Sequence, residues 1–242
     1  MARLLVIIPA YNEEAAIERT LDDLAANCPQ ADCLVVNDCS TDRTREILRR
    51  RGVNHVNLPA NLGIGGCVQT GYKYAVEHGY DITVQFDGDG QHRADCIAQL
   101  IAPILAGEAD MTVGSRFLDQ AGEKGFQSSA ARRAGIRFIS GLIRLSTGAT
   151  VRDVTSGFRA CGRRMTACFA HAYAQDYPEP EAIVTALGQG MRVKEVPVRM
   201  NERQGGVSSI RAFRSIYYMI KVSLAIVLAS DRGRAQKGES DT

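Results

Sequence analysis

The chain has 242 residues, of which 45% are hydrophobic, and its formal net charge at pH 7 is +2. This length allows one large α/β domain or two small ones with a sizeable core. The small net charge gives no general attraction to nucleic acid, so we expect no nucleic-acid partner. Seven cysteines without Cys-x-x-Cys spacing favour a reduced, cytoplasmic protein over a disulfide scaffold or a zinc site.

Neither a signal peptide nor a membrane span is expected. The apolar run at residues 4–9 is too short for a signal peptide and continues into polar residues. The longest apolar run, residues 215–230, falls short of the roughly 20 apolar residues that cross a bilayer. The sequence therefore predicts a soluble or peripheral protein.

Strand and helix patterns alternate through the first half of the chain. Short apolar runs predict buried strands at residues 4–8, 33–36, 53–57, 82–86 and 111–113. Helical spacing of apolar residues predicts helices at residues 13–27, 42–51, 65–77 and 94–105. Repeated units of this size predict an α/β fold with a mostly parallel sheet flanked by helices. In such sheets, ligands bind at the carboxyl ends of the strands.

The second half is less regular. A Gly- and Ser-rich loop at residues 119–129 precedes a basic helix at residues 130–146. An irregular stretch around residues 153–159, two short helices and a strand at residues 193–198 are expected to follow. We predict one domain, residues 1–209, and a C-terminal helix with a polar tail, residues 210–242.

The most informative motif is FDGDGQH, at residues 86–92. Asp87 and Asp89 lie one residue apart just past a predicted strand, and the glycines beside them leave the backbone free to curl. Two carboxylates and the Gln91 carbonyl suit Mg²⁺ or Mn²⁺, which usually completes its coordination with phosphate oxygens. The motif predicts a metal site for a substrate that carries a pyrophosphate. The alternative is a polar turn whose aspartate caps the next helix.

Polar residues also follow other predicted strands. Asn12 and Glu13 follow the first strand and suit a helix N-terminus as well as a ligand. Asp38 follows the second, where its carboxylate is placed to accept hydrogen bonds from a base or a ribose. A glycine-rich segment around Gly63 opens the third predicted helix and lets backbone N–H groups approach an anion. A tight turn is the alternative for that segment, which lacks the dinucleotide and Walker patterns.

Seven segments, taken in order, resemble those of the family 2 glycosyltransferases: VIIPAYNEE, VNDCSTDRT, NLGIGG, DGDGQH, VGSRF, DVTSGFR and EVPVRMNERQGGVSS. The chain is similar to the dolichol-phosphate mannosyltransferase-like and bacterial polyprenyl-phosphate glycosyltransferase branch of that family, from about residue 4 to residue 209. The resemblance implies a GT-A fold, which is Rossmann-like, a nucleotide-sugar donor, a divalent metal and inversion at the anomeric carbon.

The resemblance also implies roles for particular residues. It places around the nucleoside Pro9, Tyr11, Glu13 and Asp38. It places on the metal and the donor diphosphate Asp87, Asp89 and Gln91. It assigns Arg203 and Ser208 to a loop that closes over the diphosphate. Three features depart from the family: Asn37 stands where many relatives have a second Asp, the chain contains no Trp, and it lacks the transmembrane helices of many relatives.

The acceptor decides whether a catalytic base is needed. A hydroxyl must lose a proton, and Glu179 or Glu181 is the best candidate for its base. A lipid phosphate is already anionic and needs cations instead; the resemblance suggests for this role Arg116 and Arg132 or Arg133. The alternative is an exposed basic helix face. Asp153 and Arg159 are expected to form a structural pair beside the site.

The apolar and basic tail helix, residues 210–229, suits the membrane interface. The alternatives are packing on the core, on a membrane partner protein or on a second copy in a homo-oligomer. Together these features predict a cytoplasmic protein that is peripheral on the cytoplasmic membrane face.

The sequence thus predicts a metal-dependent inverting glycosyltransferase. It would transfer a hexose from a UDP-, GDP- or dTDP-sugar to a polyprenyl phosphate, in cell-envelope polysaccharide or glycoconjugate assembly. The candidate catalytic residues are Asp89, Arg203 and Glu181. One alternative is an enzyme of the same fold that acts on a sugar hydroxyl, and another is a non-catalytic nucleotide-sugar-binding partner of a membrane complex. A dinucleotide-dependent oxidoreductase ranks last, because the glycine fingerprint is missing.

Overall fold

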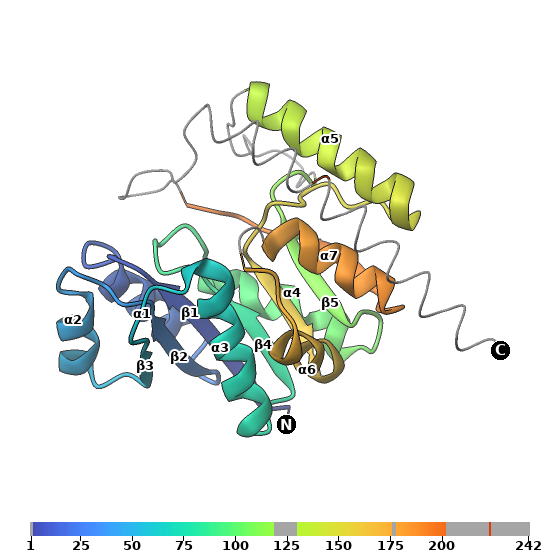
Figure 1. Ribbon diagram of the computed structural model, residues 1–242. Coiled ribbons are helices and arrows are strands. Elements are labelled where there is room, and N and C mark those ends of the chain that lie inside the picture. The colour runs from blue at the N-terminus through green and yellow to red at the C-terminus, as the bar shows by residue number, and fades with distance from the viewer. Residues whose placement is uncertain (1, 119–129, 176–177, 202–222, 224–242) are drawn as a thin grey trace.

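The computed structural model describes residues 2–118, 130–175, 178–201 and 223 (Figure 1). Its strands are β1 (Leu4–Ala10), β2 (Asp32–Asn37), β3 (His55–Asn57), β4 (Ile82–Gln85), β5 (Met111–Ser115), β6 (Arg159–Gly162) and β7 (Val193–Pro197). Its helices are α1 (Ile17–Asn27), α2 (Thr44–Arg51), α3 (Gly63–Glu77), α4 (Ile97–Leu105), α5 (Ala130–Thr147), α6 (Arg163–His171) and α7 (Pro178–Gly188), with a 3-10 turn at Ala94–Cys96.

The strands form one seven-stranded sheet in the order β3-β2-β1-β4-β6-β5-β7. All neighbours pair in parallel except β6, which is antiparallel to β4 and to β5. The predicted mostly parallel sheet flanked by helices is confirmed. The strand β6 was not expected, because its first residue, Arg159, belongs to the stretch predicted to be irregular.

Both faces of the sheet are covered. Along β1, Leu5 and Ile7 join a core with α3, α5, α6 and α7, whereas Val6 and Ile8 join a second core with α1 and α4. The helix α3 comes very close to β1, since a Cβ on Gly71 would lie 2.3 Å from Cγ2 of Ile7. Figure 1 shows α2 and β3 at one end of the sheet and α5 beyond α7.

Among the described residues, no helix is long and apolar enough to cross a membrane. The predicted tail helix, residues 210–229, lies outside the described residues apart from Ser223, which is helical. The predicted division into a domain at residues 1–209 and a C-terminal helix and tail at residues 210–242 therefore stays a prediction.

Candidate active site

The site lies where three neighbouring parallel strands end. Because β2, β1 and β4 are adjacent and parallel, the segments that follow them leave the same edge of the sheet. The backbone N–H of Asp38 donates to the carbonyl of Ala10 at 2.9 Å. A Cβ on Gly88 would lie 3.1 Å from the carbonyl oxygen of Pro9 and 3.6 Å from Cγ of Glu13. The acidic turn therefore runs directly beside the segment after β1.

The segments after β1 and β2 hold each other in place. The Asn12 side-chain oxygen accepts a hydrogen bond from the Thr41 N–H at 2.8 Å, and the Glu13 N–H donates to the Thr44 hydroxyl at 2.9 Å. Asn12 has a φ of 55°, so the chain turns sharply there. These bonds give Asn12 a structural role, while the neighbouring Tyr11 is 48% exposed at the same edge.

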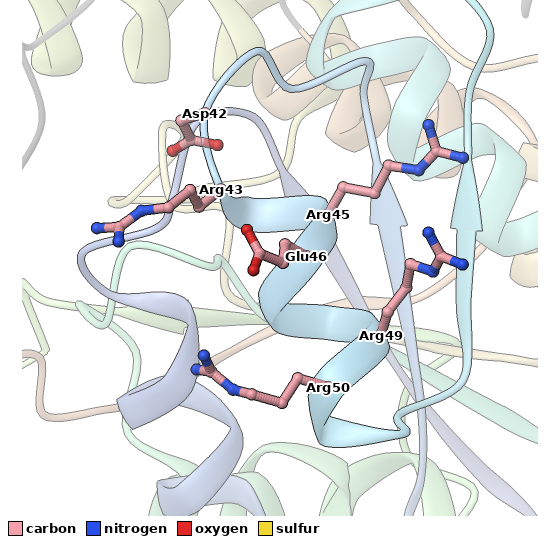
Figure 2. A pocket seen from close by; sticks show the side chains of 6 residues that line it. All are labelled: Asp42, Arg43, Arg45, Glu46, Arg49 and Arg50. Carbon is pink, nitrogen blue, oxygen red and sulfur yellow. The ribbon is translucent and has the colours of Figure 1, made fainter.

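One ion pair links α2 to α1, and another links the residues just before these two helices. Arg43 pairs with Glu14 at 3.1 Å and Arg50 pairs with Glu18 at 2.8 Å. Arg45 and Arg49 extend from the other side of α2, as Figure 2 shows.

A shallow surface pocket lies along α2 and is lined by Asp42, Arg43, Arg45, Glu46, Arg49 and Arg50. It contains none of the predicted site residues.

Asp38 connects the end of β2 to the glycine-rich segment. Its side chain is buried, and Oδ1 accepts a hydrogen bond from the Leu62 N–H at 2.7 Å. The Asn61 side-chain amide donates to the Asp38 carbonyl at 3.2 Å. Gly63, next in the chain, has a φ of +73°, and no atom lies within 4 Å of the position of its missing Cβ. Gly63 thus borders open space at this edge, next to the segment that the buried Asp38 holds in place.

The acidic turn follows β4 and is tightly held. Oδ1 of Asp89 accepts a hydrogen bond from the Gln91 N–H at 3.0 Å, and the Thr20 hydroxyl donates to the Gly88 carbonyl at 3.1 Å. On the opposite side, the Asn201 N–H donates to the Gln91 carbonyl at 2.8 Å. The turn is therefore fixed by α1 and by the segment after β7 as well as by its own bonds.

His92, which ends the turn, was not singled out in the sequence. It is 4% exposed, and its ring stacks on Phe158 with centroids 4.7 Å apart. Nδ1 is 2.9 Å from the Asp87 nitrogen and accepts its hydrogen bond. Burial lowers the pKa of His92, which favours the neutral ring that this acceptor role requires. Its place in the run FDGDGQH was the only signal in the sequence.

The donor set of the turn fits a hard divalent cation. The carboxylates of Asp87 and Asp89 and the side-chain carbonyl of Gln91 offer oxygen ligands on one short segment. Mg²⁺ is usually held by one or two carboxylates and completes its coordination with water and substrate phosphates. In the described part of the chain, no three or more His, Cys, Asp or Glu residues form a group that could hold a metal ion.

Arg116 lies in a buried ion pair. Its Nε and Nη2 atoms lie 2.7 Å from the two carboxylate oxygens of Asp153, and the Asp153 side chain is fully buried. The expected pairing of Asp153 with Arg159 is wrong, because Arg116, which directly follows β5, occupies that carboxylate. Arg159 instead donates from Nε to the Ser156 carbonyl at 2.7 Å. Arg116 thus anchors its own loop, and its contact with an acceptor stays a prediction.

The two glutamates predicted as possible bases lie near the start of α7. Burial raises the pKa of Glu179; Arg159 opposes this shift and Asp87 adds to it. Glu179 is therefore within electrostatic reach of the acidic turn. Glu181 is half-buried on the same helix, and its role as a base stays a prediction.

Four predicted site residues are not described at the level of their side chains. Arg203 and Ser208 lie outside the described residues, and Arg132 and Arg133 lie on α5 but their side chains are not among those described. Their roles stay predictions.

Comparison with known proteins gives a consistent result. The family model described as Glycosyl transferase family 2 matches residues 5–169. An undecaprenyl-phosphate mannosyltransferase of Micrococcus luteus is 30% identical over 86% of this chain and 87% of its own. A UDP-N-acetylglucosamine–dolichyl-phosphate N-acetylglucosaminyltransferase of Methanococcus voltae is 28% identical over 93% of this chain and 98% of its own.

A solved structure shares the fold. It is glucosyl-3-phosphoglycerate synthase from Mycobacterium tuberculosis in complex with Mn²⁺, uridine diphosphate and glucosyl-3-phosphoglycerate. The TM-score is 0.68 at 20% sequence identity, and the match covers 95% of this chain and 80% of that one. The predicted GT-A architecture is thereby confirmed.

The Arg116–Asp153 pair yields a prediction about stability. Asp153→Asn removes the buried carboxylate that pairs with the Arg116 guanidinium, so the free energy of unfolding should fall by about 3–5 kcal/mol, measured by urea denaturation. The control is Glu108→Gln, which breaks an exposed pair with Lys194 and should change the midpoint little. Equal midpoints for the two variants would show that the buried pair has no structural role.

Proposed function

The chain belongs to glycosyl transferase family 2, and we propose on this premise that it transfers a hexose from a nucleotide sugar to a polyprenyl phosphate with inversion at the anomeric carbon. The observation that carries the proposal is the acidic turn of Asp87 and Asp89, on the same sheet edge as Asp38. The names of two relatives, which match over 87% and 98% of their own length, give the acceptor as undecaprenyl or dolichyl phosphate.

The donor would bind across the ends of β1, β2 and β4. Pro9, Tyr11, Glu13 and Asp38 would surround the nucleoside, and Gly63 would border it. The diphosphate would reach the turn, where the oxygens of Asp87, Asp89 and Gln91 would hold Mg²⁺ or Mn²⁺ against it. A metal bound there supplies positive charge that stabilises the departing nucleoside diphosphate. Arg203 would add a charge-assisted contact to the same oxygens.

The acceptor chemistry places few demands on the protein. A phosphate monoester is anionic near neutral pH, so its oxygen attacks without a general base. What it needs is cationic groups that hold it beside the anomeric carbon. We assign this role to Arg132 and Arg133 on α5, while the buried Arg116 fixes the loop after β5. Under this assignment, Glu181 would orient arginines rather than abstract a proton.

The helix α5 supports a location at the membrane surface. Ile136, Ile139 and Ile143 on one side of α5 are buried in the core. On its outer side, Phe138 is 57% exposed and Leu145 is 82% exposed, one heptad apart. Arg137 and Arg144, directly beside them, are exposed too. Apolar side chains next to arginines are typical of helices that lie in an anionic membrane interface, where a polyprenyl phosphate presents its headgroup.

A transfer assay tests the proposed reaction. UDP-, GDP- and dTDP-sugars are offered with Mg²⁺ or Mn²⁺, with and without a short polyprenyl phosphate, and the lipid product is quantified. We expect turnover with one donor that requires both metal and lipid phosphate. Asp89→Asn should lower kcat/KM on the order of 10²-fold or more, because stabilisation of the leaving group is lost.

Asp22→Asn, on the exposed face of α1, is the control for this assay and should act as the parent does. Metal-dependent donor hydrolysis that ignores the lipid would overturn the lipid acceptor in favour of a hydroxyl. Absence of turnover with every donor would contradict the enzyme assignment.

Vesicle flotation tests the location. Phe138→Ser with Leu145→Ser should lower the partition coefficient on phosphatidylglycerol-containing vesicles at least about tenfold, since each buried side chain contributes about 1.5–3 kcal/mol. The matched control replaces Val76 and Leu105, which are 49% and 58% exposed on α3 and α4. Equal flotation of both double variants would show that α5 does not contact the membrane.

A further inference from the structure

We propose that His92 is a positioning residue for Asp87: its imidazole fixes the backbone and the carboxylate of the first aspartate of the turn in the orientation that binds the metal. This inference rests on the proposed metal site and adds to it a residue that does not touch the metal. It is carried by the contacts of His92, by the rigidity of its ring and by the surroundings of the Asp87 carboxylate.

The imidazole ring of His92 contacts both the backbone and the carboxylate of Asp87. Nδ1 of His92 accepts the backbone N–H of Asp87 at 2.9 Å. In a neutral imidazole the other nitrogen then carries the proton. That nitrogen, Nε2, lies 3.6 Å from Oδ2 of Asp87. The distance is that of an electrostatic contact rather than a direct hydrogen bond, and it places the donor side of the ring next to the carboxylate.

The ring itself has little freedom. Phe158 stacks on one face at an interplanar angle of 16°, and Phe86 meets the ring edge-on with centroids 5.6 Å apart. The backbone of His92 pairs with Met200 in an antiparallel bridge. A rotation of the imidazole would therefore require the surrounding core to rearrange.

The Asp87 carboxylate is confined on its inner side. Nε2 of Gln85 donates to Oδ1 at 3.3 Å, while His92 approaches Oδ2. A Cβ on Gly157 would lie 3.0 Å from Oδ2, so only glycine fits there without a shift. The side chain of Asp87 remains 33% exposed, which leaves room for ligands on the outer side. Asp89 differs, since Oδ1 accepts a hydrogen bond from within the turn.

His92 thus occupies the position of a residue that does not bind the metal itself but orients a carboxylate that does, here that of Asp87. Removal of such a partner typically costs 10–100-fold in metal affinity. Because His92 is buried under the turn, the loss should appear in metal binding even when no sugar is transferred.

Two variants separate the polar contacts from the packing. His92→Phe keeps the stacking on Phe158 but removes both contacts with Asp87, whereas His92→Asn supplies an acceptor near Nδ1 but loses the ring. The affinity for Mn²⁺ is measured by the EPR signal of the free ion, with the metal alone and with uridine diphosphate added. We expect His92→Phe to weaken binding about 10–100-fold and His92→Asn to recover part of it.

If His92 acted only through packing, the order of the Mn²⁺ affinities would be reversed. His92→Phe would then bind Mn²⁺ as the parent does, and His92→Asn would bind it more weakly. Parent-like affinity in His92→Phe, or weaker binding in His92→Asn than in His92→Phe, overturns the proposal. The control is His78→Asn, because His78 also stacks on an aromatic ring, Tyr74, and its Nδ1 also contacts a backbone group, but far along α3 from the turn. It should bind Mn²⁺ as the parent does.

A measurement on the parent protein covers the case in which a variant does not fold. The ¹⁵N spectrum of the imidazole should show the proton on Nε2 of His92, and added Mg²⁺ should shift that nitrogen. A proton on Nδ1, or no shift at Mg²⁺ concentrations that saturate the site, would contradict the proposal. Failure of the parent to bind Mn²⁺ would instead refute the metal site of the proposed function. If the parent binds Mn²⁺, Asp87→Asn does not and His92→Phe binds it unchanged, only the role of His92 is refuted.

Discussion

The parallel pairing of β2, β1 and β4 is the constraint on which the rest of the site depends. It brings three polar segments, which follow Ala10, Asn37 and Gln85 in the chain, to one edge of the sheet. The fixed register sets Asp38 beside Ala10 and the acidic turn beside Pro9. Hydrogen bonds tie these segments to one another, while Tyr11 stays 48% exposed and the Asp87 side chain 33% exposed at the edge. A binding edge follows from strand order before any side chain is considered.

Acidic side chains predominate at the edge of the sheet where β2, β1 and β4 end. Asp38, Asp87 and Asp89 gather negative charge at the strand ends, and the nearby Glu179 has its pKa raised by burial and by Asp87. An edge of this kind repels a diphosphate unless a cation stands between them, which is the physical reason for a divalent metal in the proposed function. The buried Arg116 does not relieve the repulsion, because Asp153 already compensates its charge.

Much of the fold and part of the site could be predicted from the sequence. The strands β1, β2 and β4 contain short apolar runs followed by polar motifs, so both their existence and their shared edge were predictable. The strand β6 was not, because RACG has no readable periodicity and its antiparallel place depends on its neighbours β4 and β5. The partner of Asp153 and the role of His92 were also out of reach, since each depends on contacts between segments that only the folded chain brings together.

We propose that the turn after β4 binds a divalent metal together with a nucleoside diphosphate. The anomalous scattering of manganese, in crystals grown with Mn²⁺ and uridine diphosphate, would locate this metal. We expect the strongest peak within bonding distance of a carboxylate oxygen of Asp87 or Asp89 and of the diphosphate. A peak elsewhere, or none at Mn²⁺ concentrations that support turnover, would contradict it.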